Sequence, residues 1–213
     1  MKVLEQLQKA IIVGEPDQAH ELATQVLEAD VAPLTAIEEA LNPGMKIVGD
    51  KYEAGEYFIP DLVMSAEAMK GAMEIFEPEL MARHEQRTVL GTVIVGTVEG
   101  DIHEIGKSLV GTMLTATGFQ VHDLGVDVPA DKFVAQVKET KANVVGLSAL
   151  LTTTMLNQKL VIEALEEAGL RERVKVIVGG APASDDWAQT IGADAYAENA
   201  NEAVGIVKRL VEV

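Results

Sequence analysis

The stretch from Val89 to Val98 consists almost entirely of branched apolar residues, glycine and threonine. A strand of this composition is buried on both faces, which is typical of a parallel sheet covered by helices. After it, short apolar runs alternate with segments of helical period. We predict strands at residues 89–98, 119–124, 143–149, 174–179 and 194–197, and helices at 104–117, 130–140, 154–169, 184–191 and 201–211. Five such units predict a doubly wound, Rossmann-type α/β domain over residues 89–213, with a five-stranded parallel sheet in flavodoxin-like order.

Residues 1–82 have helical periodicity and no segment that alternates as a strand does. Apolar residues recur at helical spacing, and the helix starts and stops fall at Gly14, Pro16, Pro33 and Pro60. We therefore predict an N-terminal four-helix bundle over residues 1–82, whose third helix is interrupted at 42–44. The polar segment 83–88, which contains His84, is predicted to link the two domains.

The composition excludes several classes of function. A net charge of -17 argues against nucleic acid and against anionic membranes, because both require clustered Lys and Arg. The chain has 0 cysteines, so thiolate metal sites and disulfides are excluded, and histidine and carboxylates remain as metal ligands. The first ten residues lack the apolar core of a signal sequence, and no apolar run is long enough to span a membrane. We expect a cytoplasmic protein.

The segment Gly100–Gly106 follows the first predicted strand and places Asp101 two residues before His103. In parallel sheets, ligands bind beyond the carboxyl ends of the strands, which is where this segment lies. Glu99, Asp101 and Glu104 would repel a phosphate, so a nucleotide is the wrong ligand. A carboxylate next to a histidine suits a metal site instead, because it orients the ring and raises its basicity. The alternative is a solvated surface loop with a helix-capping histidine.

Other predicted strand ends carry small or hydroxylated residues. The third strand ends in the segment 146–154, the fourth in Gly179-Gly180, and the fifth near residues 196–200. Small side chains at neighbouring strand ends leave space between the sheet and its helices, which would admit a slender group. Each feature also has an ordinary explanation, because Gly-Gly is common in turns and threonines often cap helices.

Three motifs in order identify a resemblance to a family. Asp101-x-His103-x-x-Gly106 is followed by 41 residues (107–147), Ser148-x-Leu150, 28 residues (151–178) and Gly179-Gly180. This pattern resembles the cobalamin-binding module of methionine synthase and its relatives. With a helical domain before it, the chain is similar to the corrinoid protein of a multi-component methyltransferase system. Gly49-Asp50-x-Tyr52-x-x-Gly55-x-Tyr57-Phe58-Ile59-Pro60 is similar to that family's cap segment.

The resemblance implies roles for individual residues. His103 would be the lower axial ligand of the cobalt in a cobalamin or related cobamide, displacing the cofactor's own base. Asp101 would hold the other ring nitrogen, and Thr154 would supply the hydroxyl that completes this catalytic group. Ser148 and Thr152 would line the slot for the nucleotide tail, for which Gly179 and Gly180 would make room. The remaining cofactor-binding residues would be Gly100, Ile102, Glu104, Gly106, Leu150, Asn199 and Ala200, with Tyr52 and Ile59 covering the methyl face.

The resemblance also implies partners and leaves alternatives. The chain would not be an enzyme on its own, but a methyl carrier between a substrate-specific methyltransferase and an acceptor (tetrahydrofolate or thiol) methyltransferase, and a reductive activase is a further partner. The donor could be methanol, methylamine, betaine or an aryl methyl ether. The main alternative is a cobalamin-dependent sensor or regulatory protein, although no DNA-binding or signalling domain is recognisable here. A mutase small subunit would not need the helical domain, and a phospho-receiver would need an aspartate at the position of Ser148.

The aromatic residues of the segment 52–60 allow two interpretations. Three of the seven Tyr and Phe residues of the chain lie there, between two predicted helices. They could close the end of the bundle locally, or they could form an apolar lid over a ligand on a neighbouring domain.

Overall fold

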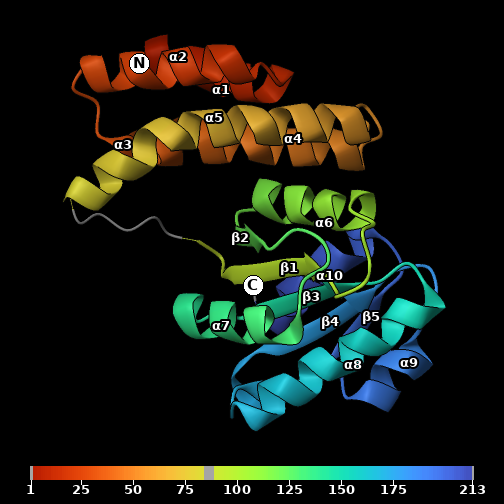
Figure 1. Cartoon of the computed structure of the whole chain (residues 1–213). Helices are drawn as coiled ribbons and strands as arrows, with labels where there is room; N and C mark the ends of the chain where they lie inside the picture. The colour runs from red at the N-terminus through yellow and green to blue at the C-terminus, as the bar shows by residue number, and fades with distance from the viewer. Residues whose placement is uncertain (1, 84–88, 213) are drawn as a thin grey trace. The chain divides into compact units, whose positions relative to one another are not determined.

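The computed structural model of the 213-residue chain describes residues 2–83 and 89–212 (Figure 1). The described residues form two compact units. The helical unit consists of the residues before 84 and groups with residues 115–118, and the sheet unit consists of the other residues after 88. Most of the predicted linker 83–88, including His84, lies outside the described residues, and Arg83 is the last residue of a helix.

The helical unit contains only helices in its described part, as predicted. They are α1 (Lys2–Val13), α2 (Pro16–Glu28), α3 (Pro33–Ala36), η1 (Ile37–Leu41), α4 (Asn42–Glu53) and α5 (Ile59–Arg83). Their buried faces carry the apolar residues that the periodicity selects, such as Leu4, Leu7 and Ile11 on α1. Val63 is an exception, because it is an apolar residue at helical spacing on α5 and is nevertheless 38% exposed.

The predicted break in the third helix is wrong. The backbone remains helical from Pro33 through Glu53, because α3, η1 and α4 follow one another without a gap. The π-helical turn η1 precedes Pro43, and residues on both sides of it keep right-handed helical angles. A proline removes one N–H and crowds the preceding turn, and a widened turn relieves that conflict without ending the helix.

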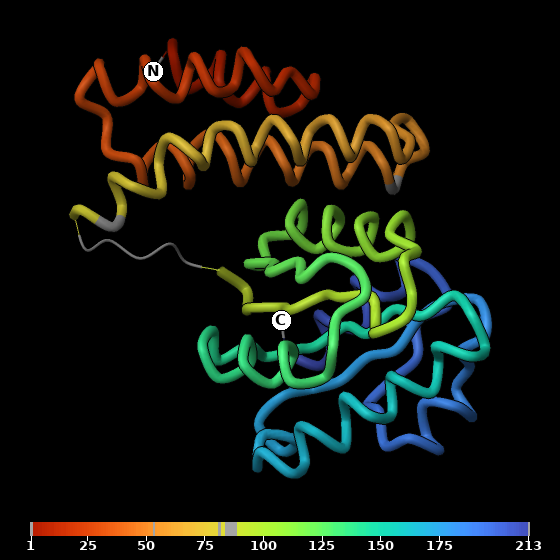
Figure 2. Tube along the Cα trace, in the orientation of Figure 1, coloured from red at the N-terminus to blue at the C-terminus, as the bar shows by residue number. Residues whose placement is uncertain are grey.

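The sheet unit has the predicted five parallel strands. They are β1 (Thr92–Thr97), β2 (Gln120–Asp123), β3 (Val144–Ser148), β4 (Lys175–Gly179) and β5 (Ala195–Ala197). Their order is β2-β1-β3-β4-β5, which is the flavodoxin-like order. The chain returns through a helical crossover between successive strands (Figure 2), so all the carboxyl ends lie on one edge. Five of the six residues of β1 are buried, as its composition predicts.

Helices cover both faces of the sheet. On one face, α6 (Ile105–Ala116) and α10 (Ala200–Leu210) pack against Val93, Val95 and Ile177. On the other, α7 (Ala130–Thr140), α8 (Thr152–Glu167) and α9 (Asp185–Ile191) pack against Ile94, Val145 and Val178. A 3-10 turn, η2 (Arg171–Arg173), precedes β4. The strand order reverses between β1 and β3, so their carboxyl ends form the switch point where open α/β sheets bind ligands.

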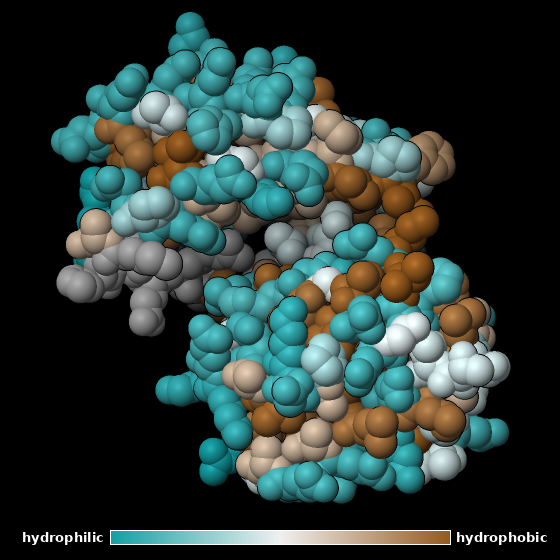
Figure 3. All heavy atoms as spheres, viewed as in Figure 1, coloured by the Kyte–Doolittle hydropathy of each residue, from teal (hydrophilic) through white to brown (hydrophobic). Residues whose placement is uncertain are grey.

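Hydrophilic side chains dominate the face drawn in Figure 3, interrupted by apolar patches. The strongly exposed apolar side chains include Ile102 and Ile105 after β1, and Leu150 and Leu151 after β3. None of the described helices combines the length and the apolar character that a membrane span requires.

Candidate functional site

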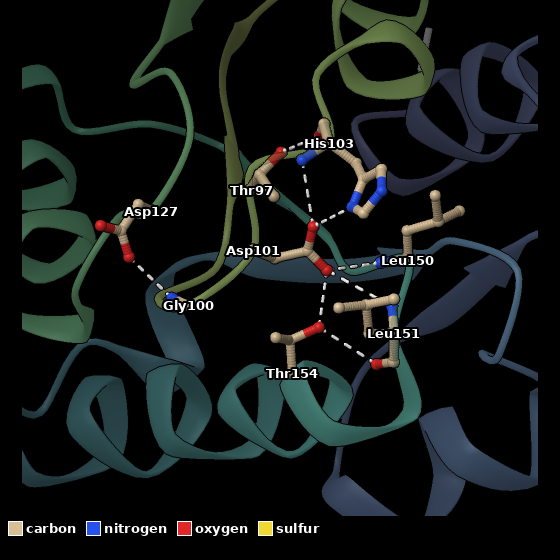
Figure 4. A network of polar contacts seen from close by, with 8 residues as sticks. All are labelled: Thr97, Gly100, Asp101, His103, Asp127, Leu150, Leu151 and Thr154. Atoms are coloured by element: carbon tan, nitrogen blue, oxygen red, sulfur yellow. Dashed lines mark hydrogen bonds and ion pairs between the residues drawn. The ribbon is translucent and has the colours of Figure 1, made fainter.

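The turn after β1 is held by hydrogen bonds to its backbone (Figure 4). The Gly100 N–H donates to the carboxylate of Asp127 at 2.7 Å, and the Asp127 N–H donates to the Asp101 carbonyl at 2.9 Å. The buried Thr97 hydroxyl donates to the His103 carbonyl at 2.8 Å. These contacts come from β1 and from the loop after β2, so two strands fix the backbone that carries Asp101 and His103.

Asp101 is fully buried and its carboxylate joins the ends of β1 and β3. One oxygen accepts from the His103 N–H at 3.1 Å and lies 2.6 Å from His103 Nδ1. The other accepts from the Leu150 N–H at 2.8 Å and from the Thr154 hydroxyl at 2.6 Å, with the Leu151 N–H at 3.4 Å. The three residues assigned to one group in the sequence, Asp101, His103 and Thr154, are therefore in contact.

This environment keeps Asp101 ionised. Burial by itself would raise its pKa, but hydrogen bonds from Thr154, the Leu150 N–H and His103 stabilise the carboxylate. Together they hold the pKa of Asp101 well below its usual range. Asp101 is therefore an acceptor for all its donors at neutral pH.

The state of Asp101 fixes the tautomer of His103. Because a carboxylate can only accept, the hydrogen between the two side chains sits on Nδ1, and a neutral ring then has its lone pair on Nε2. Figure 4 shows Nε2 turned away from Asp101, and the side chain is 46% exposed. Among the described residues, none makes a hydrogen bond to Nε2. His103 thus offers one basic nitrogen outward, supported from behind by a buried anion.

A cavity of about 780 Å³ opens beside His103, between the sheet and the helices α6 and α10. At Gly106, an added Cβ would meet no atom within 4 Å, so a side chain there would extend into open space. At Gly180, where φ is +118°, an added Cβ would lie 1.8 Å from the Ala149 oxygen. The cavity is lined by many of the predicted cofactor-binding residues: Ile102, His103, Glu104, Gly106, Ser148, Leu150, Gly179, Gly180, Asn199 and Ala200.

Some predicted site residues are not among those that line this cavity. Thr152, predicted to line the slot beside Ser148, is exposed at the start of α8 and is not among the residues that line the cavity. Gly100 lies in the turn after β1, where its N–H donates to Asp127, and it does not line the cavity. Tyr52 and Ile59, predicted on a loop, belong to the last turn of α4 and the first residue of α5 in the helical unit. The connecting segment is therefore only residues 54–58.

Sequence reasoning missed Lys107, which lines the cavity one turn after His103. It is 3% exposed, and its ammonium pairs with Asp123 at the end of β2, with a Glu104 oxygen at 3.9 Å. A lysine within the apolar run that follows Ile105 is the signal that could have found it, because buried lysines require a partner. Asp127 and Thr97 gave no such signal.

Comparisons with known proteins agree with this arrangement. A family model described as the B12 binding domain matches residues 91–205, and a second B12 binding domain model matches residues 3–77. The trimethylamine corrinoid protein of Methanosarcina barkeri is 47% identical over 212 residues, covering 100% of this chain and 98% of the relative. The dimethylamine corrinoid protein 2 of Methanosarcina acetivorans is 49% identical over 213 residues, with 99% and 96% covered.

A solved structure is similar over the same length. It is a chain of the methanol:cobalamin methyltransferase complex MtaBC from Methanosarcina barkeri, with 34% identity and a TM-score of 0.88. The match covers 99% of the present chain and 80% of that chain.

Proposed function

Because the chain belongs to the B12-binding corrinoid proteins and binds a cobamide, we propose that it carries methyl groups between two methyltransferases with His103 as the lower axial ligand. The observation that carries this proposal is the free Nε2 of His103, held in place by the buried carboxylate of Asp101 at the mouth of a cavity.

The residues present fit a cobamide. In the described part of the chain, no cluster of three His, Asp or Glu side chains could hold a metal ion by itself. A corrin ring supplies most of the ligands of its own cobalt, so the protein would need to offer only one nitrogen, and Nε2 of His103 would be that ligand. The cofactor's displaced base and its nucleotide tail would need a deep slot, which the cavity beside Gly106 and Gly179 supplies. Most of that lining is apolar or lacks side chains, which suits a flat heterocycle.

The chain's own residues have three tasks in this proposal. Asp101 orients the imidazole and increases its basicity toward the metal. Thr154 and the backbone N–H of Leu150 keep Asp101 in place and ionised. The exposed Ile102 and Leu150 at the rim offer an apolar surface to the ring. The bound cobamide supplies the cobalt centre that accepts and releases the methyl group.

The partners follow from the same proposal. We expect a substrate-specific methyltransferase to load the carrier and an acceptor methyltransferase to unload it, with no turnover by the chain alone. Two relatives named for trimethylamine and dimethylamine are more similar in sequence than the chain from the methanol system. This favours a methylated amine as the methyl donor.

The test is reconstitution with cobalamin followed by absorption and electron paramagnetic resonance spectra. For the wild type we expect bound cobalamin whose unpaired electron, in the one-electron-reduced state, couples to a nitrogen that shifts on 15N-histidine labelling. His103→Ala should retain cobalamin, since the other residues that line the cavity are unchanged, but lose that coupling.

The matched control is His20→Ala, because His20 is exposed on α2 in the helical unit. Its spectra should equal those of the wild type. If His103→Ala also kept the wild-type spectra, axial ligation by His103 would be disproved.

A further inference from the structure

Gln158 is a fully buried polar residue on α8, on the face of the sheet opposite the cavity. Its Nε2 donates to two carbonyls, that of Leu147 at 3.0 Å and that of Gly179 at 3.1 Å. Its Oε1 accepts from the indole N–H of Trp187 at 2.9 Å. The side chain therefore connects the ends of β3 and β4 to each other and to α9.

Two independent sets of hydrogen bonds determine the orientation of the Gln158 amide. An indole N–H can only donate, so the amide oxygen must face Trp187. The two carbonyls can only accept, so the amide nitrogen must face the strand ends. Both requirements give the same rotamer, and the two hydrogens of Nε2 are matched by two acceptors. Such fully satisfied buried groups fix one local arrangement, because any other leaves a polar atom unpaired.

The strand ends that Gln158 connects form the floor of the cavity. Leu147, Gly179 and Gly180 all line it, and Ser148 pairs with Gly179 in the sheet. The two strand ends also approach each other closely. A Cβ added at Gly180 would lie only 1.8 Å from the Ala149 oxygen, so only glycine fits there. A small displacement of the β4 end would therefore change the width of the slot. His103 would keep its contacts, because Asp101 is held by groups at the ends of β1 and β3.

We propose that Gln158 is a positioning residue that selects for corrinoids with a nucleotide tail. It acts from behind the sheet by holding the carbonyls of Leu147 and Gly179, and thereby keeps the slot open to the tail without touching the cofactor. The inference rests on the proposed function, since it requires the tail to occupy the cavity.

The test compares Gln158→Met with the wild type for two ligands, cobalamin and the tail-less cobinamide. Methionine retains the length of glutamine but lacks both the donor and the acceptor. We expect the Kd for cobalamin to increase about tenfold, as the loss of buried hydrogen bonds implies, while the Kd for cobinamide changes less than about twofold. An equal increase for both ligands, or no increase for cobalamin, would overturn the inference.

Two further variants separate positioning from general loss of stability. Val161→Ala removes part of a buried apolar side chain from the same helix and leaves the hydrogen bonds of Gln158 in place, so it should lower the melting temperature but leave both Kd values unchanged. Trp187→Phe removes the indole donor together with part of the ring but leaves both carbonyl contacts of Gln158, so it should weaken cobalamin binding in the same direction but less. If Val161→Ala reproduced the loss of cobalamin binding, the effect would be one of stability and the inference would fail.

Gly106→Leu separates the role proposed for Gln158 from the proposed binding of the nucleotide tail in the cavity. Its side chain would fill the open space of the cavity, so cobalamin binding should be lost and cobinamide binding kept. If Gly106→Leu bound cobalamin normally, the tail would not use the cavity, and both the binding mode and the inference would fail. If only Gln158→Met bound it normally, the inference alone would fail.

Discussion

The end of β1 and the end of β4 border the same cavity, but the first carries polar side chains and the second carries glycines without side chains. After β1, polar side chains meet, and the Asp101 carboxylate accepts hydrogen bonds from His103, Leu150 and Thr154. After β4, Gly179 and Gly180 present no side chains, and the neighbouring Ala149 carbonyl occupies the place where a Cβ of Gly180 would lie. The end of β1 therefore depends on the hydrogen bonds of its side chains, whereas the end of β4 depends on the absence of a Cβ at Gly180.

The difference predicts two kinds of response to substitution. A polar network loses stability in steps, one hydrogen bond at a time, and depends on pH through its charged member. A steric constraint fails abruptly when one methyl group is added, and the failure does not depend on pH. The following predictions test this contrast in order of expected effect.

The largest effect is expected for Gly180→Ala. The backbone has φ of +118°, which side chains rarely permit, and the new Cβ would collide with the Ala149 carbonyl. We expect a loss of roughly 4 kcal/mol or more in the free energy of unfolding, measured by urea titration. Gly192→Ala is the matched control, because its φ is +78° and its Cβ would meet nothing within 4 Å, so it should cost only about 1 kcal/mol. Equal losses would show that the close approach to Ala149 is unimportant.

The next effect is expected for Asp101→Asn, which replaces a buried acceptor with an amide that is partly a donor. We expect a loss of roughly 3 kcal/mol at neutral pH, because several N–H and O–H donors lose a charged partner. Asp127→Asn should lose less than about 0.5 kcal/mol, since that carboxylate is exposed and an amide oxygen can still accept from Gly100.

The loss caused by Asp101→Asn should depend on pH. The pKa of Asp101 is lower in the folded state than in the unfolded state, so below the unfolded value the unfolded chain binds more protons. The stabilisation by Asp101 is therefore complete above about pH 5 and declines as the pH falls through about 4 and lower. Urea titrations of both proteins should give the full difference near neutral pH and a smaller one below about pH 4. A difference that grew in acid would contradict the assigned charge.

Most of the fold could be predicted because its signals are local. The composition of β1 indicates burial on both faces, and the alternation after it gives each strand and helix to within a few residues. The exceptions are in the helical unit. Pro43 suggests a break, yet the backbone remains helical through η1. Gly55 and Pro60 suggested a connection over residues 52–60, but Tyr52 still belongs to α4 and Ile59 already begins α5.

The site could be predicted only where its residues carry a pattern. Asp101 and His103 are two residues apart, and their contact follows directly from the turn. Gln158 is 11 residues from Leu147, 21 from Gly179 and 29 from Trp187, so its partners meet only through the sheet. Lys107 on α6 likewise pairs with Asp123 on β2, which is 16 residues away in the sequence. Residues that belong to a motif are visible in the sequence, whereas Gln158 and Lys107 have partners that only the topology brings to them.

The smallest effect is expected for Thr154, where the hydroxyl and the methyl group can be removed one at a time. Thr154→Val keeps the shape but removes the hydroxyl that donates to Asp101 at 2.6 Å, so we expect a loss of roughly 1.5 kcal/mol by urea titration. Thr154→Ser keeps the hydroxyl and removes only a methyl, and it should be closer to the wild type. Because the remaining donors still hold Asp101, the tautomer of His103 should survive in both variants, and the histidine signal in the spectrum of bound cobalamin should persist. If Thr154→Ser were the more damaging change, the packing of the methyl group and not the hydrogen bond would support Asp101, and the end of β1 would resemble the end of β4 after all.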